Sequence, residues 1–180
     1  SICVQTSPRL PERNSSPNGI MSTNSNAPII TNILPSLPTA SRNVLDLEAE
    51  WCKANNCDQH EGTATNVAHW STPPQFEELG LTGGILHVDG KIAAFTFGMP
   101  INQDTFGVHV EKADTSIDGA YAMINYEFAN HIPEQYVYLN REEDLGIEGL
   151  RKAKLSYQPA IILEKYVACL KDEPVEAIKW

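Results

Sequence analysis

The sequence is poor in cysteine and in basic residues, and it has no long apolar run. Its four cysteines, Cys3, Cys52, Cys57 and Cys169, show neither the close pairs of a zinc site nor the density of a secreted disulfide scaffold. We therefore expect reduced, structural cysteines and no metal site. The formal net charge of -10 argues against DNA binding, which needs a cationic surface. No apolar run is long enough for a transmembrane segment, and the N-terminus lacks a signal-peptide core, so the expected location is cytoplasmic.

Acidic residues are scarce near the N-terminus. Residues 1–43 contain Glu12 as their single acidic residue and half of the twelve prolines, and they are rich in Ser, Asn and Thr. Such a segment buries too little apolar surface to offset its ordering entropy, so we expect it to be disordered or loosely ordered. The remaining length suits one domain over residues 44–171, followed by an acidic C-terminal tail over residues 172–180.

Two helical segments are expected early in this domain. The first begins near Val44 and ends near Asn55, since residues 44, 47, 48, 51 and 52 fall at helical spacing. As charged residues, its Glu48 and Glu50 are expected to face water. A second covers residues 64–79 and must break at Pro73-Pro74, since an interior proline removes a backbone donor.

Three strands are expected next. Residues 83–88 and 91–98 are apolar runs joined by Asp89-Gly90, which predicts an antiparallel hairpin. Residues 106–113 form the third strand. Its alternation places Val108 and Val110 on one face of the sheet and His109 and Glu111 on the other.

A helix from Gly119 to about His131 separates this strand from another over residues 136–140. Its expected buried stripe consists of Ala120, Ile124, Phe128 and Ile132. A strand, a crossover helix and a second strand form a parallel unit, whose carboxyl ends share one edge of the sheet. Ligands of open α/β sheets bind at that edge, where Glu111-Lys112 and Asn140-Arg141 should meet.

An acidic loop and a short basic helix follow the second strand of this unit. We expect Asp144 or the pair Glu142-Glu143 to cap the helix, because a carboxylate complements the positive end of the helix dipole. A last strand is expected over residues 160–169, after the turn at Pro159.

This part of the chain also carries a family resemblance. Residues 140–146 and 150–157, with residues 111–114 upstream and 163–166 downstream, resemble the C-terminal domain family of phosphatidylglycerol lysyltransferases. The similarity runs from about Val44 to about Leu170. It implies an α/β (α+β) fold of the GNAT acyltransferase type, in which a mixed sheet combines an antiparallel N-terminal hairpin, a parallel strand pair linked by a crossover helix, and flanking helices.

The resemblance implies acyl or aminoacyl transfer, with aminoacyl-tRNA or acyl-CoA as donor. Such a reaction needs a proton acceptor and a group that stabilises the oxyanion. The candidate catalytic residues are Glu111, His109 and Arg141. The candidate substrate-binding and donor-binding residues are Lys112, Asp114, Gly119, Asn140, Glu142, Asp144, Arg151, Lys152, Lys154 and Tyr157.

The turn before the helix at Gly119 bears on the choice of donor. GNAT-like proteins usually place an Arg and two glycines at the turn that binds a pyrophosphate, whereas this chain has Asp118-Gly119 there. A carboxylate would repel the pyrophosphate, which favours aminoacyl-tRNA over acyl-CoA. Alternatively, Glu111, Lys112, Arg141 and Asp144 form a buried ion-pair network with a structural role only.

Two other functions remain open. Members of the resembled family carry two such halves in tandem, and this chain has room for one, so it could instead be a noncatalytic binding module or a homodimer. The second alternative is an acetyl-CoA-dependent N-acetyltransferase. Stabilisation by coenzyme A would distinguish the latter, because a ligand that binds only the native state raises the melting temperature.

Overall fold

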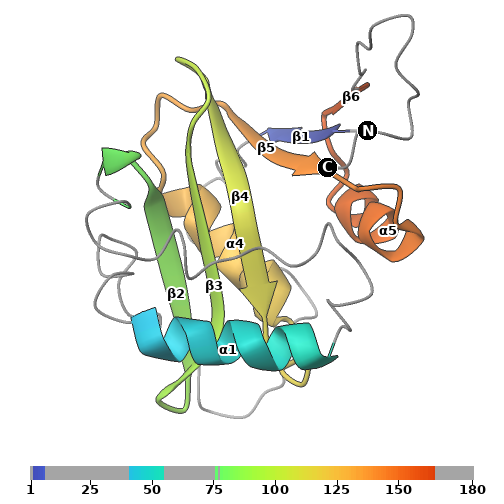
Figure 1. Cartoon of the computed structure of the whole chain (residues 1–180). Helices are drawn as coiled ribbons and strands as arrows, with labels where there is room; N and C mark the ends of the chain where they lie inside the picture. Colours follow the sequence, from blue (N-terminus) through green and yellow to red (C-terminus); the bar gives the residue numbers. More distant parts are fainter. Residues whose placement is uncertain (1, 7–40, 55–75, 77, 165–180) are drawn as a thin grey trace, which may run out of the picture.

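The described part of the computed structural model forms one six-stranded mixed sheet with a helix on each face (Figure 1). It comprises residues 2–6, 41–54, 76 and 78–164. The strand order is β2-β3-β4-β5-β1-β6. The elements are β1 (Ile2–Thr6), α1 (Ser41–Ala54), β2 (Thr82–Val88), β3 (Lys91–Pro100), β4 (Thr105–Ala113), α4 (Ala120–His131), β5 (Tyr138–Glu143), α5 (Glu148–Ser156) and β6 (Ile161–Leu163).

The predicted hairpin is confirmed. Strands β2 and β3 pair antiparallel, with Val88 opposite Lys91. Asp89 and Gly90 between them have φ values of 52° and 78°, and a two-residue turn of this hand matches the twist of the paired strands. Strand β4 continues the antiparallel arrangement beside β3.

The predicted parallel unit is also confirmed. Strands β4 and β5 run parallel, and their register extends from Thr105 opposite Tyr138 to Gly107 opposite Asn140. Helix α4 connects them. Strand β5 begins two residues later than expected, and Tyr136 instead packs its ring 5.3 Å from that of Phe106.

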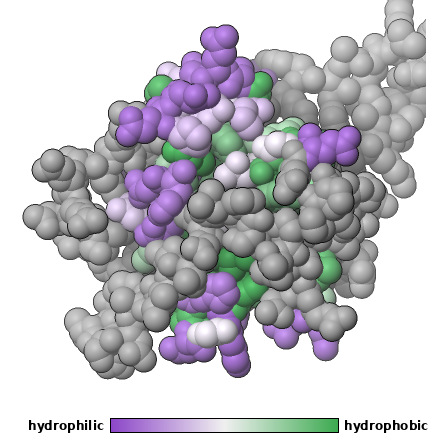
Figure 2. All heavy atoms as spheres, turned by 90° about the vertical axis from the view of Figure 1, so that its left-hand side faces the viewer, coloured by the Kyte–Doolittle hydropathy of each residue, from purple (hydrophilic) through white to green (hydrophobic). Residues whose placement is uncertain are grey.

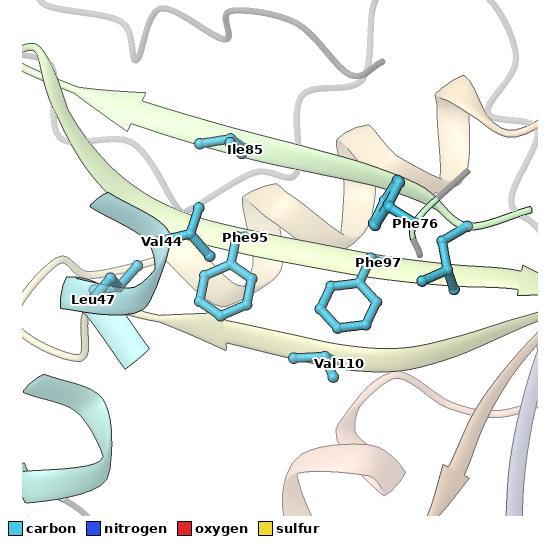
Figure 3. Close-up of a cluster of buried hydrophobic side chains, with 8 residues drawn as sticks. Val44, Leu47, Phe76, Ile85, Phe95, Phe97 and Val110 are labelled. Carbon is cyan, nitrogen blue, oxygen red and sulfur yellow. The ribbon is translucent and has the colours of Figure 1, made fainter. Parts of the chain in front are cut away.

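The two helices divide the core between the two faces of the sheet. Helix α1 lies in front of the sheet in Figure 1 and α4 lies behind it. Figure 3 shows the front cluster, in which Val44 and Leu47 of α1 and Phe76 pack against Phe95 and Phe97 of β3. Behind the sheet, the predicted stripe of α4 is buried as expected; its members are Ala120, Ile124, Phe128 and Ile132.

A β-bulge in β4 overturns one prediction. Val108 packs with Phe128 in the core behind the sheet, whereas Val110 belongs to the front cluster. The register explains this difference: Phe97 pairs with Val110 but Gly98 pairs with Val108, so one extra residue enters β4. An extra residue reverses the face on which all later side chains lie. The expected grouping of Val108 with Val110 is therefore wrong.

The N-terminal and C-terminal strands also differ from the expectation. Residues 2–6 belong to the segment expected to be disordered or loosely ordered, yet they form β1, which pairs antiparallel with both β5 and β6. Strand β6 covers residues 161–163, and residues 165–169 of the predicted strand lie outside the described residues. The rest of the predicted N-terminal segment up to residue 40, most of the predicted second helix with Pro73-Pro74, and the predicted tail lie outside the described residues.

Hydrophilic and hydrophobic residues are both visible on the side of the molecule where β2 lies (Figure 2). Figure 2, which looks at this side, shows hydrophilic side chains above and below and hydrophobic side chains between them. Within the described residues, none of the helices is both long enough and apolar enough to cross a bilayer.

Candidate functional site

An ion pair bridges β4 and β5 beyond the end of their backbone pairing. The last parallel pair is Gly107 with Asn140. Further along the strands, the Arg141 guanidinium binds both carboxylate oxygens of Glu111, with Nη2–Oε1 at 2.7 Å and Nη1–Oε2 at 3.3 Å. The two side chains are only 11% and 8% exposed. The structure therefore brings these two predicted catalytic residues together as a bidentate, nearly buried pair.

Two further residues complete the surroundings of this pair. Asn125 of α4 donates from Nδ2 to Glu111 Oε2 at 3.4 Å. The ring of Tyr157, just after α5, lies 4.4 Å from Arg141 Cζ. Burial raises the pKa of Tyr157, and the charge of Glu111 raises it further. Burial by itself lowers the pKa of Arg141, but Glu111 and Tyr157 more than offset this, so Arg141 remains a cation.

His109 belongs to a separate pair. Its Nδ1 lies 2.5 Å from Glu142 Oε1, and the two side chains are 26% and 45% exposed. His109 Cε1 is 3.5 Å from the position that a Cβ on Gly107 would take, which places the ring on the face of the sheet opposite Phe106 and Val108. Glu111 lies on the α4 face, where Asn125 binds it. The prediction that His109 and Glu111 share one face is therefore wrong.

Lys112 lies on the α1 face rather than with Glu111. Its Nζ is 3.2 Å from Glu48 Oε1 and 4.5 Å from the centre of the Trp51 ring. Glu48 is only 9% exposed, so the expectation that it faces water is wrong: a buried cation on β4 holds it inside. Burial lowers the pKa of Lys112, and Glu48 partly offsets this effect.

The neighbourhood of Lys112 also corrects the expected state of one cysteine. Cys52 of α1 takes part in a disulfide, whereas the sequence favoured reduced cysteines. Its Sγ is 4.0 Å from Lys112 Nζ. The spacing of the cysteines along the sequence could not reveal this, because a disulfide depends on the distance in space.

An ion pair connects the acidic loop to α5. Asp144, 2% exposed, accepts hydrogen bonds from Arg151 Nε at 2.6 Å and from the Gly146 N–H at 2.9 Å. Ile147 is the N-cap residue of α5 and no side chain caps it, so the predicted capping by Asp144, Glu142 or Glu143 is wrong. The carboxylate of Asp144 instead accepts hydrogen bonds from Arg151, which lies one turn inside the helix.

The three cations of α5 have different surroundings. Arg151 binds Asp144, and Lys154 Nζ donates to the backbone carbonyls of Arg141 and Glu143, the latter at 2.6 Å. Lys152 is exposed. Two of the three predicted donor-binding cations thus connect α5 to the end of β5, and Lys152 is directed to the surface.

The ion pair between Asp144 and Arg151 should make the stability of the domain depend on pH. The hydrogen bond from Arg151 and that from Gly146 lower the pKa of Asp144 below its ordinary value. We expect Asp144→Asn to cost about 1 kcal/mol at pH 7, since Arg151 is half exposed and solvent screens the pair. The stability from this pair is present above about pH 4, the unfolded value, and is lost as the pH falls through the folded pKa.

Urea unfolding at several pH values measures this. The gap between wild type and Asp144→Asn should shrink below about pH 4, whereas the exposed Glu148→Gln should leave stability nearly unchanged. A gap that stayed constant down to the lowest pH would contradict the ionised role of Asp144.

Of the remaining predicted residues, Asp114 and Gly119 lie in the loop before α4, and Asn140 lies in β5. Asp114 Oδ1 accepts hydrogen bonds from Ser116 N at 2.8 Å and Ser116 Oγ at 2.7 Å, which lower the pKa of Asp114. Gly119, with φ at 79°, is the N-cap residue of α4, which no side chain caps. Asn140 Oδ1 accepts a hydrogen bond from Glu142 N at 2.8 Å.

The alternative of a purely structural role predicted one ion-pair network that contains Glu111, Lys112, Arg141 and Asp144. The structure instead shows these residues in three separate ion pairs. Glu111 binds Arg141, Lys112 binds Glu48, and Asp144 binds Arg151. Asn125, a partner of Glu111, is not among the residues predicted from the sequence. Its position next to Ile124 in the buried stripe of α4 is the signal that could have indicated it.

The mixed sheet, the crossover helix and the parallel pair of β4 and β5 define a GNAT-like domain. Residues 30–169 match the family described as phosphatidylglycerol lysyltransferase, C-terminal. The chain belongs to this family. No curated protein matches it.

Two solved structures are similar to the chain. A conserved protein of unknown function from Bacteroides thetaiotaomicron is 74% identical with a TM-score of 0.65, and the match covers 69% of this chain and 43% of that one. The C-terminal domain of a proposed lysylphosphatidylglycerol synthetase from Agrobacterium fabrum is 11% identical with a TM-score of 0.53, covering 88% of this chain and 56% of that one. The second likeness concerns the fold alone. The chain spans less than half the length of the Bacteroides protein it matches.

Proposed function

We propose that this domain transfers an aminoacyl group from the ester of an aminoacyl-tRNA to a hydroxyl of a phosphatidylglycerol headgroup. Family membership supports this reaction, since the family is described by lysyl transfer to that lipid. The observation that carries the proposal is the end of the β4–β5 pairing at Gly107 and Asn140. Beyond it, charged side chains of both strands pair on the two faces of the sheet, Glu111 with Arg141 on the α4 face and His109 with Glu142 on the opposite face.

Aminoacyl transfer needs a group that takes the proton of the attacking hydroxyl and a charge that stabilises the oxyanion. His109 and Glu111 are the two candidate proton acceptors beyond the end of the β4–β5 pairing, one on each face of the sheet, and Arg141, which pairs with Glu111, is the cation. Lys152 is exposed on α5 and supplies a contact for phosphate. The reaction requires no pyrophosphate cradle, which agrees with the acidic turn of Asp114 and Asp118 before α4.

A direct transfer assay tests the proposal. The purified chain is incubated with radiolabelled lysyl-tRNA and phosphatidylglycerol vesicles, and lipid-extractable lysine is counted. We expect transfer by wild type and by a control variant, Lys91→Ala, at an exposed position of β3. A folded chain that moves no label from lysyl-tRNA or other aminoacyl-tRNAs would refute the proposal. Thermal stabilisation by coenzyme A would favour the acetyl-CoA alternative instead.

The exposed edge at β6 favours a second candidate, a binding or dimerisation module. Ile161, Ile162 and Leu163 are 39%, 53% and 44% exposed, and β6 is the last strand in the sheet order. An uncovered apolar edge strand can pair with another chain. Light scattering coupled to gel filtration tests this: a dimer that Ile162→Lys converts to a monomer supports the candidate, and a monomeric wild type rules out self-association.

A further inference from the structure

Both strands of the parallel pair are irregular where their pairing ends. In β4, Phe97 pairs with Val110 while Gly98 pairs with Val108, so His109 is the extra residue. In β5, Ile2 pairs with Glu143 while Val4 pairs with Asn140, so one extra residue lies between Asn140 and Glu143. Each irregularity lies within three residues of the last parallel pair. Bulges are frequent beside active sites because they redirect a side chain.

These two irregularities direct His109 and Glu142 toward each other. Glu142 has a φ of 56°, a conformation that side-chain-bearing residues rarely adopt. Its carboxylate reaches His109 Nδ1 at 2.5 Å. Backbone strain at a charged residue persists when its surroundings fix it, and here the Glu142 N–H is held by Asn140 Oδ1.

The pair determines which nitrogen of His109 accepts a proton. A carboxylate only accepts hydrogen bonds, so the proton of a neutral imidazole lies on Nδ1 and the lone pair lies on Nε2. Nε2 is buried and has no hydrogen-bond partner among the residues that the structure describes. A buried acceptor without a partner is uncommon and is typical of a site that receives a ligand's donor group.

We infer that His109 is the general base of the proposed transfer and that Glu142 is its positioning residue; this inference rests on the proposed function. His109 Nε2 takes the proton of the lipid hydroxyl as its oxygen attacks the ester carbonyl carbon of the aminoacyl group. The bond between that carbon and the ribose oxygen of the tRNA then breaks, and the proton passes from Nε2 to the departing oxygen. The lipid ester and the free tRNA hydroxyl form without any further reactant.

The surroundings of Glu111 support this choice between the two predicted bases. Both oxygens of Glu111 bind Arg141, and one also accepts from Asn125. A proton on Glu111 would weaken this ion pair in a nearly buried place, so Glu111 is poorly suited to accept one. The Nε2 atom of His109 loses no hydrogen bond to a described residue when it accepts a proton.

Nitrogen-15 NMR of the His109 ring tests the positioning pair without any substrate. We expect the wild type to carry its neutral-form proton on Nδ1, and Glu142→Ala to lose this preference and populate the Nε2–H tautomer. The matched control Glu148→Gln, an exposed position of α5, should keep the wild-type tautomer. A wild type with the proton on Nε2 would overturn the pair.

The lysyl-transfer assay tests the base role. His109→Gln should lower kcat by about 10²–10⁴-fold, and Glu142→Gln should lower kcat by a smaller factor, with KM unchanged for both variants and melting temperatures near that of wild type. Unchanged kcat in a folded His109→Gln would overturn the base role. Failure of the folded wild type to transfer any label would refute the proposed function and the base role together, whereas the tautomer result reports on the pair alone.

Discussion

Replacing Arg141 by alanine should destabilise the domain by about 3–5 kcal/mol, because removal of one member of a buried ion pair leaves the other charge uncompensated. Glu111 is 8% exposed and receives two hydrogen bonds from Arg141. The variant also loses the contact between the guanidinium and the Tyr157 ring. Urea denaturation at pH 7 measures the change.

A double variant is the matched control for this prediction. Glu111→Leu with Arg141→Met removes both charges and keeps most of the volume, so it should cost much less than Arg141→Ala. The binding of a lysyl-tRNA probe should be measured on the same proteins. An Arg141→Ala protein that keeps its stability but loses binding would show that Arg141 serves the ligand rather than the connection of β4 to β5.

Gly98→Ala should destabilise the domain by about 1–3 kcal/mol or more, because the extra methyl group has no room. A Cβ at Gly98 would lie 1.8 Å from the Gly107 carbonyl oxygen, a backbone atom of the neighbouring strand. The pairing of β3 and β4 would have to shift beside the bulge that positions His109. Thermal or urea unfolding measures the loss.

Gly149→Ala provides the control for this substitution. Gly149 lies within α5, and a Cβ there would meet no atom within 4 Å. Alanine is favoured over glycine in a helix by about 1 kcal/mol, so this variant should be at least as stable as wild type. Equal effects of Gly98→Ala and Gly149→Ala would contradict the close approach of β3 and β4.

Local patterns predicted the elements that surround the site. Asp89-Gly90 between two apolar runs indicated the hairpin, since the turn is set by two neighbouring residues. The stripe of α4 followed from helical spacing and is buried as predicted. The parallel arrangement of β4 and β5 followed from the length of the connection between them. These predictions succeeded because each depends on residues that are close in the sequence.

The partners of the charged side chains were not predictable in the same way. Glu48 was expected in water because its helix pattern contains no information on the buried Lys112, which lies on a different element. Asp144 was expected to cap α5, but Arg151 uses its carboxylate. In each case an ion pair formed in three dimensions outweighed the local preference.

The sequence by itself determined the mixed α/β architecture, the hairpin, the parallel strand pair and the family, because repeating apolar spacings and linked motifs depend on the chain alone. The tertiary structure decided which charges pair and which face each one occupies. The bulge at His109 is the physical reason. One extra residue, set by the pairing of β4 with β3, separates His109 from Glu111 and brings it to Glu142.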